Sequence, residues 1–308
     1  MLVVSLFLIP CTIRSNREIA GQPFDVEECR GCDLFLADHS AAVNMDACEN
    51  CHIFIGPVES SVFIRNCTNC RIIVACQQFR MRDCHSCEVL LYCLTEPVIE
   101  SSKDIRFGCF YFAYDHLAEQ FQNAQLSLYH NMWSYIYDFN SNAAQTHYQL
   151  LSLKEMTKEP GNFLRKTMPV ALLSDDSTCM DTNDVASAST SQTACPVPLT
   201  VSSAFSKDLP SLVMFVFAPH HALIPSMILS ILEATFNEVL CLQSREWNLQ
   251  PPTQKAMQQH LEECLPASQS DMNRRELQAR YMEGAVISLE FSGDDVVHDI
   301  RSWVRLPA

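Results

Sequence analysis

The sequence predicts two folded parts, a mainly β N-terminal domain built as a parallel β-helix and a small α/β C-terminal domain of ferredoxin-like type. Four CxxC pairs support the first part, and they begin at Cys29, Cys48, Cys67 and Cys84, in steps of 19, 19 and 17 residues. A repeat this short is typical of stacked coils. After each pair comes a short run rich in Val, Ile, Leu or Phe: DLFLA, HIFIG, RIIVA and EVLLY. Runs of this length favour strands over helices, so each repeat is expected to form one coil.

The chain begins with an apolar stretch, MLVVSLFLIPCTIRSN, and we expect residues 1–19 to form a separate segment before the β-helix. The stretch has the length of a signal peptide, but it lacks a basic start and a convincing cleavage site of small residues. A signal peptide therefore stays an alternative. A bilayer span needs about 20 apolar residues, and no segment of the chain meets that length.

The β-helix domain is expected to cover residues 20–157. From residue 107 the repeat gives way to FGCFYFAYDHLAEQFQNAQ, whose spacing predicts a helix from about Tyr114 to Gln122 and a flank that covers the end of the coils. Residues 158–208 contain few large apolar residues and many Ser, Thr and Asp residues. This composition is typical of a disordered linker.

Residues 209–308 alternate between strand and helix patterns. The strand patterns are SLVMFVFAP, EVLCLQSREW and GAVISLEFSG, and the helix patterns are PSMILSILEATFN, TQKAMQQHLEECL and DDVVHDIRSWV. Asp294 or Asp295 is a suitable N-cap for the last helix. Strands and helices taken in turn fit a small α/β or split βαβ domain.

The composition disfavours several classes of function. A net charge of −15 with 21 Lys and Arg residues argues against a nucleic-acid-binding protein, because such proteins need clustered basic residues. There are seven glycines and no GxxxxGK[ST] or GxGxxG motif, so no glycine loop is available for nucleotide phosphates. We therefore expect no cofactor of the protein's own, and a nucleotide that matters would be bound to a partner.

The 16 cysteines are concentrated in one third of the chain, which favours reduced thiols over a secreted disulfide scaffold. Neighbouring CxxC pairs with fifteen residues between them also match a zinc-site spacing. In stacked coils, however, the same cysteine recurs at the same place in every coil, so the thiols would form a column and not a tetrahedron. Small buried thiols suit such a column. Packing is the favoured interpretation, with zinc and disulfides as alternatives.

One run differs chemically from its counterparts, because the third repeat has QQFRMR where the second has SSVFIR. A strand has a period of two, so Gln78, Arg80 and Arg82 are expected to face away from the core. Two interpretations are open. The run is either a solvated face balanced by Asp83 and Glu88, or it presents an arginine to a phosphate on another protein.

Several segments together resemble the tubulin cofactor C domain family from about Ala20 to Phe139: GQPF, DHSAAVNMDAC, IFIGPVESSVFIRNC, CQQFRMRDC, EPVIESS and FGCF. Members of this family are right-handed parallel β-helices that activate GTPases, either ARF-like small GTPases or tubulin. The resemblance implies that Arg80 is an arginine finger, that Gln77 helps to arrange the GTPase site and that Glu100 lies in the interface.

Gln78 and Arg82, on the same face as Arg80, are expected to contact the same partner. The resemblance implies that this partner brings both GTP and Mg²⁺. An arginine finger supplied in trans accelerates hydrolysis by roughly 10³ to 10⁵.

The function that the resemblance favours is GTPase activation on an ARF-like GTPase in its GTP state, with a role in ciliary or flagellar protein trafficking. The alternatives are a non-catalytic scaffold that binds a small GTPase or tubulin, and a zinc-stabilised structural module. A cytoplasmic location at the base of a cilium or flagellum is expected. The most similar family members start with Met-Gly-Cys for acylation, whereas this chain starts with Met1 and Leu2 and has its first cysteine at Cys11. Peripheral membrane association therefore stays open.

The C-terminal part resembles, more distantly, the nucleoside diphosphate kinase-like domain that follows the β-helix in the most similar family members. GAVISLEFSG and the order of the elements carry this resemblance. The NxxHGSD motif of active kinases does not occur in the sequence, so this domain is expected to be inactive.

Overall fold

The structure is a computed structural model of the chain. It describes residues 2–7, 11–14, 19–142, 145–158, 195–206, 209–216, 220–235, 238–248, 285–296 and 300. The chain divides into two compact units, Met1–Val197 and Pro198–Ala308. None of the helices in the described ranges is long and apolar enough to cross a membrane.

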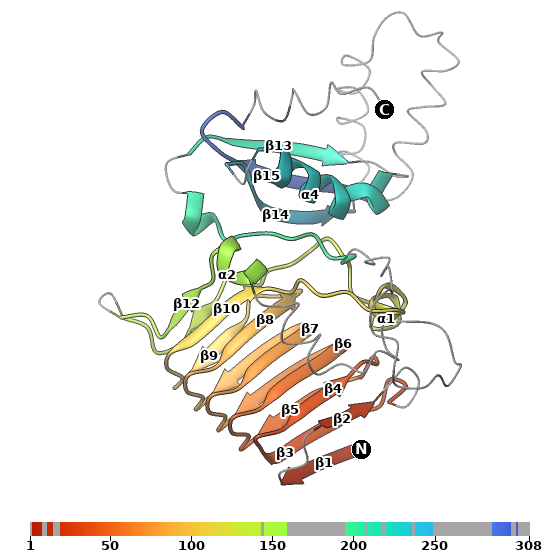
Figure 1. Cartoon of the computed structure of the whole chain (residues 1–308), viewed down its shortest axis with the longest axis vertical. Helices are drawn as coiled ribbons and strands as arrows, with labels where there is room; N and C mark the ends of the chain where they lie inside the picture. The colour runs from red at the N-terminus through yellow and green to blue at the C-terminus, as the bar shows by residue number, and fades with distance from the viewer. Residues whose placement is uncertain are drawn as a thin grey trace, which may run out of the picture. The chain divides into compact units, whose positions relative to one another are not determined.

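The first unit is a parallel β-helix, and its strands are stacked as successive rungs (Figure 1). The strands are β1 (Leu2–Phe7), β2 (Cys11–Arg14), β3 (Phe24–Arg30), β4 (Asp33–Leu36), β5 (Val43–Asp46), β6 (His52–Arg65), β7 (Arg71–Arg82), β8 (Glu88–Cys93), β9 (Val98–Glu100), β10 (Ile105–Cys109), β11 (Tyr137–Asp138) and β12 (Tyr148–Leu150).

All pairings between these strands are parallel. One ladder joins β1, β3, β5, β6, β7, β9 and β11, and a second joins β2, β4, β6, β7, β8, β10 and β12. β6 and β7 take part in both ladders because each is long enough to pass around a corner of the coil. The prediction of a parallel β-helix is confirmed.

The N-terminal segment forms a further coil, whereas the sequence predicts that it lies outside the β-helix. β1 pairs with β3, and β2 pairs with β4. Two apolar runs of strand length are compatible with both a signal peptide and a coil, and pairing with the next coil satisfies their backbone groups. The buried carboxylate of Asp38 accepts hydrogen bonds from the backbone N–H groups of Ile19 and Ala20, both at 2.8 Å. These bonds fix the chain where it enters the next coil.

Each coil turns at its CxxC corner through two residues in the left-handed conformation. One stands directly before each cysteine of the pair, or before Ser102 and Ile105 in the coil that lacks the pair. Their φ angles lie between +47° and +62°, and the residues are Glu28, Gly31, Ala47, Asn50, Asn66, Asn69, Asp83, Ser86, Ser101 and Asp104. Gly, Asn and Asp adopt this conformation most readily, and they occupy six of the ten positions. The residues before the cysteines, and not the cysteines themselves, therefore determine the turn at this corner.

Ala47 meets this backbone requirement poorly, because alanine in the left-handed conformation costs about 1 kcal/mol. Ala47→Gly removes the penalty without removing a core contact, since Ala47 is exposed. We expect urea unfolding of the full chain to give a free energy of unfolding that is higher by about 0.5–1 kcal/mol. Ala42→Gly, at a position without a positive φ, should lower this free energy, and a decrease for both variants would contradict the role given to the corner.

The coil that carries Arg80 is shorter than the two before it. The register between β6 and β7 leaves Gly56 of β6 without a counterpart, and it places two residues of β6 opposite the single residue Gln77. The shortening from 19 to 17 residues in the repeat therefore falls on the side of the coil just before Arg80. Gln77 becomes the corner residue of that side.

Two helices accompany the later coils, α1 (Leu117–Asn123) and α2 (Leu153–Lys158). Phe121 of α1 packs its ring against the rings of Tyr92, at 5.1 Å between centroids, and Phe110, at 6.2 Å. The predicted helix therefore exists, but it begins three residues later than Tyr114, because His116 before it has a φ of +70°. Met156 of α2 is buried, and its Sδ accepts the backbone N–H of Cys109 at 3.0 Å.

The second unit contains η2 (Ser203–Ser206), β13 (Ser211–Val216), η3 (His220–Leu223), α4 (Ile224–Ala234), β14 (Leu240–Trp247) and β15 (Val286–Ser292). β15 pairs antiparallel with β13 on one side and with β14 on the other. β13 and β14 consequently run in the same direction and are connected through α4, which is the split βαβ arrangement. The prediction of a small α/β domain is confirmed. The predicted helix at residues 253–265 and most of the one at 294–304 lie outside the described residues.

Most of the predicted linker, residues 159–194, also lies outside the described residues. Its last part differs from the prediction, because Cys195, Val197, Leu199 and Val201 are buried. Apolar residues alternate along CPVPLTV, which is a local signal for burial, and the structure buries every residue from Val197 to Ser202. The composition of the whole stretch, which is rich in Ser and Thr, conceals that signal.

Candidate functional site

Strand β7 presents Arg80 to solvent. Gln78, Arg80 and Arg82 are exposed, whereas Phe79 and Met81 are buried, in the alternation that a period of two predicts. All three polar side chains therefore lie on the outer face of one ladder of the β-helix.

The backbone below Arg80 is held on both edges and from behind. Arg80 lies beside Phe63 of β6 in the register and beside Val98 of β9 on the other edge. Directly before it, the ring of buried Phe79 packs in the core against Phe107, with 6.0 Å between centroids. A central strand with a packed core face has little freedom to move, so the Arg80 side chain extends from a rigid base.

Arg80 differs from the other arginines of the first unit, because its guanidinium makes no hydrogen bond or ion pair with any described residue. Every other arginine whose side chain the structure describes in this unit has an acidic partner. The pairs are Arg30 with Glu49 at 4.0 Å, Arg65 with Asp46 at 3.0 Å, Arg71 with Glu88 at 2.9 Å, Arg82 with Asp83 at 3.3 Å and Arg106 with Glu88 at 3.0 Å.

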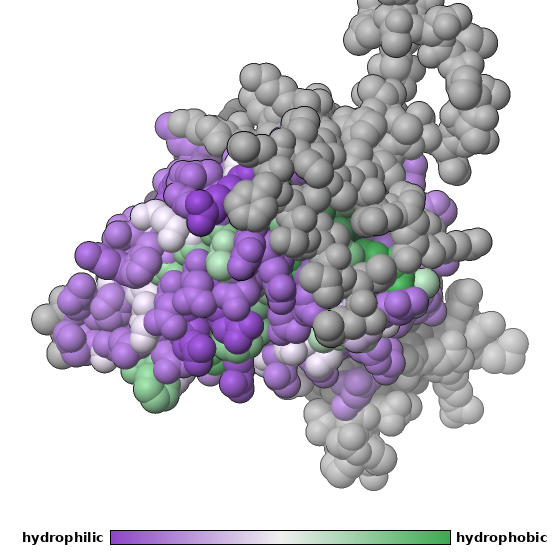
Figure 2. Space-filling view, turned by 90° about the horizontal axis from the view of Figure 1, so that it is seen from below, coloured by the Kyte–Doolittle hydropathy of each residue, from purple (hydrophilic) through white to green (hydrophobic). Residues whose placement is uncertain are grey.

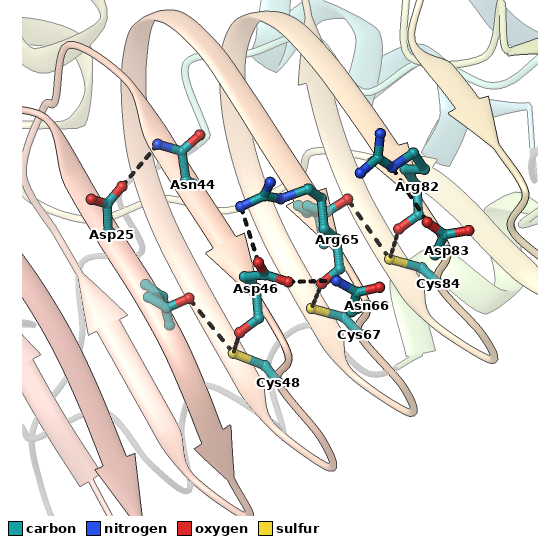
Figure 3. A network of polar contacts seen from close by, with 12 residues as sticks. Asp25, Asn44, Asp46, Cys48, Arg65, Asn66, Cys67, Arg82, Asp83 and Cys84 are labelled. Atoms are coloured by element: carbon teal, nitrogen blue, oxygen red, sulfur yellow. Dashed lines mark hydrogen bonds and ion pairs between the residues drawn. The ribbon is translucent and has the colours of Figure 1, made fainter.

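The neighbours of Arg80 along the coils are already engaged (Figure 3). Asp46 binds Arg65 and also accepts a hydrogen bond from Asn66 at 2.8 Å, and Arg82 turns to Asp83. The guanidinium groups of Arg65 and Arg82 also lie 5.3 Å and 5.8 Å from the ring centroid of Phe63. Carboxylates on this face therefore satisfy the flanking arginines and leave Arg80 available.

Gln77 and Glu100 lie on either side of Arg80, and neither side chain makes a hydrogen bond or ion pair with another described residue. Gln77 is half-buried at the corner, three residues before Arg80. Glu100 is exposed in β9, opposite Arg82 in the register. With strands about 4.8 Å apart and about 3.3 Å per residue, the Cα atom of Glu100 is about 8 Å from that of Arg80. The two opposite charges are close enough to meet one partner, and they make no ion pair with each other in the structure.

Two exposed aromatic residues complete this face, and no sequence pattern singles them out. Tyr137 is 55% exposed and Phe139 is 63% exposed. Tyr137 lies opposite Val98 in the register between β11 and β9, one strand further from Arg80. Figure 2 shows hydrophilic residues over most of the described surface in its view. Tyr137 and Phe139 are the only large apolar side chains that are exposed among the described residues of the first unit. The aromatic pair follows the last repeat, and no periodic signal places it beside Arg80.

The residues of this site lie in a segment that matches a known protein family. Residues 21–139 match the family described as Tubulin binding cofactor C. The Protein XRP2 of Danio rerio is 36% identical over 288 residues, which cover 94% of this chain and 70% of that protein. The chain belongs to the XRP2 family.

Other members of the XRP2 family match a shorter part. The Mus musculus protein is 54% identical over 134 residues, 44% of this chain and 39% of its own length. The Xenopus laevis protein is 56% identical over 134 residues, 44% of this chain and 38% of its own length. The chain thus spans about two fifths of these relatives. The solved structure of Tubulin Binding Cofactor C from Leishmania major is similar with a TM-score of 0.37 and 28% sequence identity, over 41% of this chain and 87% of that chain.

The site lies in the part that the XRP2 family shares with the tubulin binding cofactor C family. Gln77, Arg80, Glu100, Tyr137 and Phe139 all fall within the matched residues 21–139. The second unit contributes none of them.

This XRP2-family β-helix also contains two columns of thiols. Cys29, Cys48, Cys67 and Cys84 form one column and Cys32, Cys51, Cys70 and Cys87 the other, and all eight are buried and outside any disulfide. Each thiol donates to the carbonyl two residues before it, at 3.0–3.5 Å. Several also donate to a carbonyl of the preceding coil, as Cys51 does to Cys29 at 3.3 Å, and Figure 3 shows such bonds for Cys48 and Cys84. The thiols thus connect neighbouring coils.

Neighbouring thiols shift one another's pKa in opposite directions. Hydrogen bonding to Cys48 and Cys84, together with burial, raises the pKa of Cys67, and burial above all raises the pKa of Cys76. Hydrogen bonding to Cys29 and Cys67 lowers the pKa of Cys48 to about 4, and hydrogen bonding to Cys70 lowers that of Cys51 to about 7. Within the described ranges, no group of three or more His, Cys, Asp or Glu residues is arranged to hold a metal ion.

We expect the purified chain to keep its fold in the presence of a strong chelator, because the thiols connect the coils through carbonyls. Urea unfolding in EDTA and in its absence should give the same midpoint, and elemental analysis should find less than one zinc per chain. One tightly bound zinc whose removal unfolds the β-helix would show that the zinc alternative is correct.

Proposed function

We propose that this protein is a GTPase-activating protein for an ARF-like small GTPase and that it supplies Arg80 in trans to GTP bound on that partner. The single observation that carries the proposal is the state of Arg80. It is exposed, it has no partner among the described residues, and its strand is paired on both edges. An arginine finger neutralises the charge that develops on the transferred phosphoryl group, which is worth roughly 10³ to 10⁵ in rate, or about 4–7 kcal/mol.

The lack of a carboxylate partner matters for this role. A paired arginine would have to break its ion pair before it could bind a phosphoryl oxygen, whereas Arg80 has no pair to break. Its base on β7 also needs no rearrangement. Groups that are oriented before the reaction stabilise a transition state at little reorganisation cost, and the planar guanidinium can contact two oxygens at once.

The other exposed groups on this face have roles in the same proposal. Gln77 helps to arrange the catalytic site of the GTPase, and Glu100 binds a basic group of the partner. Tyr137 and Phe139 provide apolar anchors, since interfaces favour aromatic residues and arginine. Gln78 and Arg82 lie beside these residues and contribute polar contacts. GTP and Mg²⁺ belong to the GTPase, and this chain needs no nucleotide of its own.

The proposal includes a role in ciliary or flagellar protein trafficking, in the cytoplasm at the base of that organelle. This role is supported by the resemblance of the β-helix segments to the tubulin cofactor C domain family. Microscopy of the tagged full chain in a ciliated cell tests this location, and a uniform distribution through the cell would contradict it.

The alternative is a scaffold that binds a small GTPase or tubulin without accelerating hydrolysis. The description of the matching family, Tubulin binding cofactor C, favours tubulin as the second partner to test. Such a scaffold needs the aromatic anchors and Glu100 but has no use for an unpaired arginine.

Single-turnover hydrolysis separates the two functions. A panel of ARF-like GTPases and tubulin, each loaded with GTP, is mixed with the full chain at increasing concentration, and binding is measured in parallel. We expect at least one ARF-like GTPase to hydrolyse GTP faster by on the order of 10³ or more. Binding without acceleration would favour the scaffold.

A further inference from the structure

We infer that Thr95 is a positioning residue for Gln77, an inference that rests on the function proposed for the Arg80 site. Gln77 is the residue that the register between β6 and β7 skips, because the pairing passes from Cys76 directly to Gln78. Two residues of β6 in the preceding coil lie opposite Gln77, and neither pairs with it in the ladder. Its orientation depends on the coil that follows.

That following coil holds the Gln77 carbonyl with three donors. The backbone N–H of Thr95 donates at 3.1 Å, its hydroxyl Oγ1 also donates at 3.1 Å, and the Cys93 thiol donates at 3.5 Å. A backbone bond of the first kind connects other coils as well, for example from Glu59 to the carbonyl of Ser40 at 2.9 Å. The hydroxyl bond is an addition at this corner. Because Thr95 is exposed, water could satisfy its hydroxyl, so the bond is not required by burial.

Fixing this carbonyl fixes the direction of Gln77. The carbonyl belongs to the peptide plane between Gln77 and Gln78, so its orientation sets how the chain enters the part of β7 that carries Arg80. The side-chain amide of Gln77 makes no hydrogen bond with another described residue. Its direction is consequently set through the backbone, and Thr95 is the residue that fixes that backbone by both of its donors. A displacement of about 1 Å in a positioned group can lower a rate by on the order of 10²-fold.

The test compares Thr95→Val, Thr95→Ser and a matched control in the full chain. Valine keeps the branched shape and removes the hydroxyl, and serine restores it. Thr68→Val is the control, because Thr68 is also exposed and its hydroxyl makes no hydrogen bond with a described residue. We expect Thr95→Val to lower the saturating single-turnover rate on the GTPase that the unchanged chain accelerates most by on the order of tenfold. Its dissociation constant for that GTPase should not change, and Thr95→Ser and Thr68→Val should behave as the unchanged chain.

A second readout needs no GTPase. The ¹⁵N order parameter of the Gln78 backbone amide, which shares a peptide plane with the Gln77 carbonyl, should fall in Thr95→Val and stay constant in Thr95→Ser and Thr68→Val. If this parameter is unchanged in Thr95→Val, or if rate and affinity fall together, Thr95 is not a positioning residue. If the unchanged chain accelerates hydrolysis and Thr95→Val does so equally, the inference fails while the proposed function stands. If the unchanged chain accelerates no GTPase, the proposed function fails, and the role of Thr95 in catalysis fails with it.

Discussion

Replacing Arg80 by alanine is expected to lower the single-turnover rate of GTP hydrolysis on the cognate GTPase by on the order of 10³ or more, because the developing phosphoryl charge loses its partner. Arg80 is exposed and makes no bond with a described residue, so Arg80→Ala removes no core contact. The variant should unfold at the same urea concentration as the unchanged chain. It should also still bind the GTP-loaded GTPase, since the rest of the interface remains.

Two further variants make this expectation specific. Arg80→Lys should restore little activity, because an ammonium group cannot reproduce the planar fork of a guanidinium. Arg30→Ala is the matched control, since Arg30 is an exposed arginine of the same β-helix that lies in the register opposite Glu49 at a CxxC corner. It should leave hydrolysis unchanged. If Arg80→Ala and Arg30→Ala accelerate hydrolysis equally, Arg80 is not an arginine finger.

A second large effect is expected at Gly56, on stability. Gly56 is buried in β6, where a Cβ atom would lie 2.5 Å from the backbone oxygen of Asp38, 3.0 Å from the Tyr114 hydroxyl and 3.1 Å from the backbone oxygen of Leu36. Two of these three atoms belong to the backbone of the preceding coil and cannot move aside alone. Overpacking of this kind costs up to about 3 kcal/mol, so we expect Gly56→Ala to lower the free energy of unfolding by about that amount in urea.

Gly31→Ala is the control, because its cost has a different origin. No atom lies within 4 Å of a Cβ atom at Gly31, but its φ is +62°. The backbone penalty alone is about 1 kcal/mol. A smaller loss of stability at Gly56 than at Gly31 would show that the coils can separate to admit a methyl group.

The coils of the β-helix could be predicted because their signal is periodic. The CxxC pairs mark the corner, and the apolar runs after them mark the strand that enters the core. The first coil could not be predicted in this way, since residues 2–7 and 11–14 contain no CxxC pair and resemble a signal peptide. Only the pairing of β1 with β3 and of β2 with β4 distinguishes the two possibilities.

The left-handed corner residues were present in the sequence as Asn, Asp and Gly before the cysteines. Their meaning is clear only when the φ angles show that Glu28 and Ala47 adopt the same conformation. The cysteines attract attention because of their chemistry, whereas the residues before them decide the turn.

At the site, the direction of Arg80 followed from the period of two along a strand, and the structure agrees. The sequence could not show that the guanidinium of Arg80 has no ion-pair partner among the described residues. Asp83 is near Arg80 in the chain, and it binds Arg82 instead. Tyr137 lies 57 positions after Arg80 and two strands away in the same ladder, a distance that no local pattern spans.

The most direct test of the role of Arg80 is its contribution to a transition-state complex. The GTPase that the unchanged chain accelerates most is loaded with GDP and aluminium fluoride, which imitates the phosphoryl group in transfer, and the affinity of the chain is measured by calorimetry. We expect the unchanged chain to bind this form tightly and Arg80→Ala to bind it much more weakly, while both bind the form loaded with a non-hydrolysable GTP analogue alike. Equal affinity of both chains for the aluminium fluoride form would contradict an arginine finger at position 80.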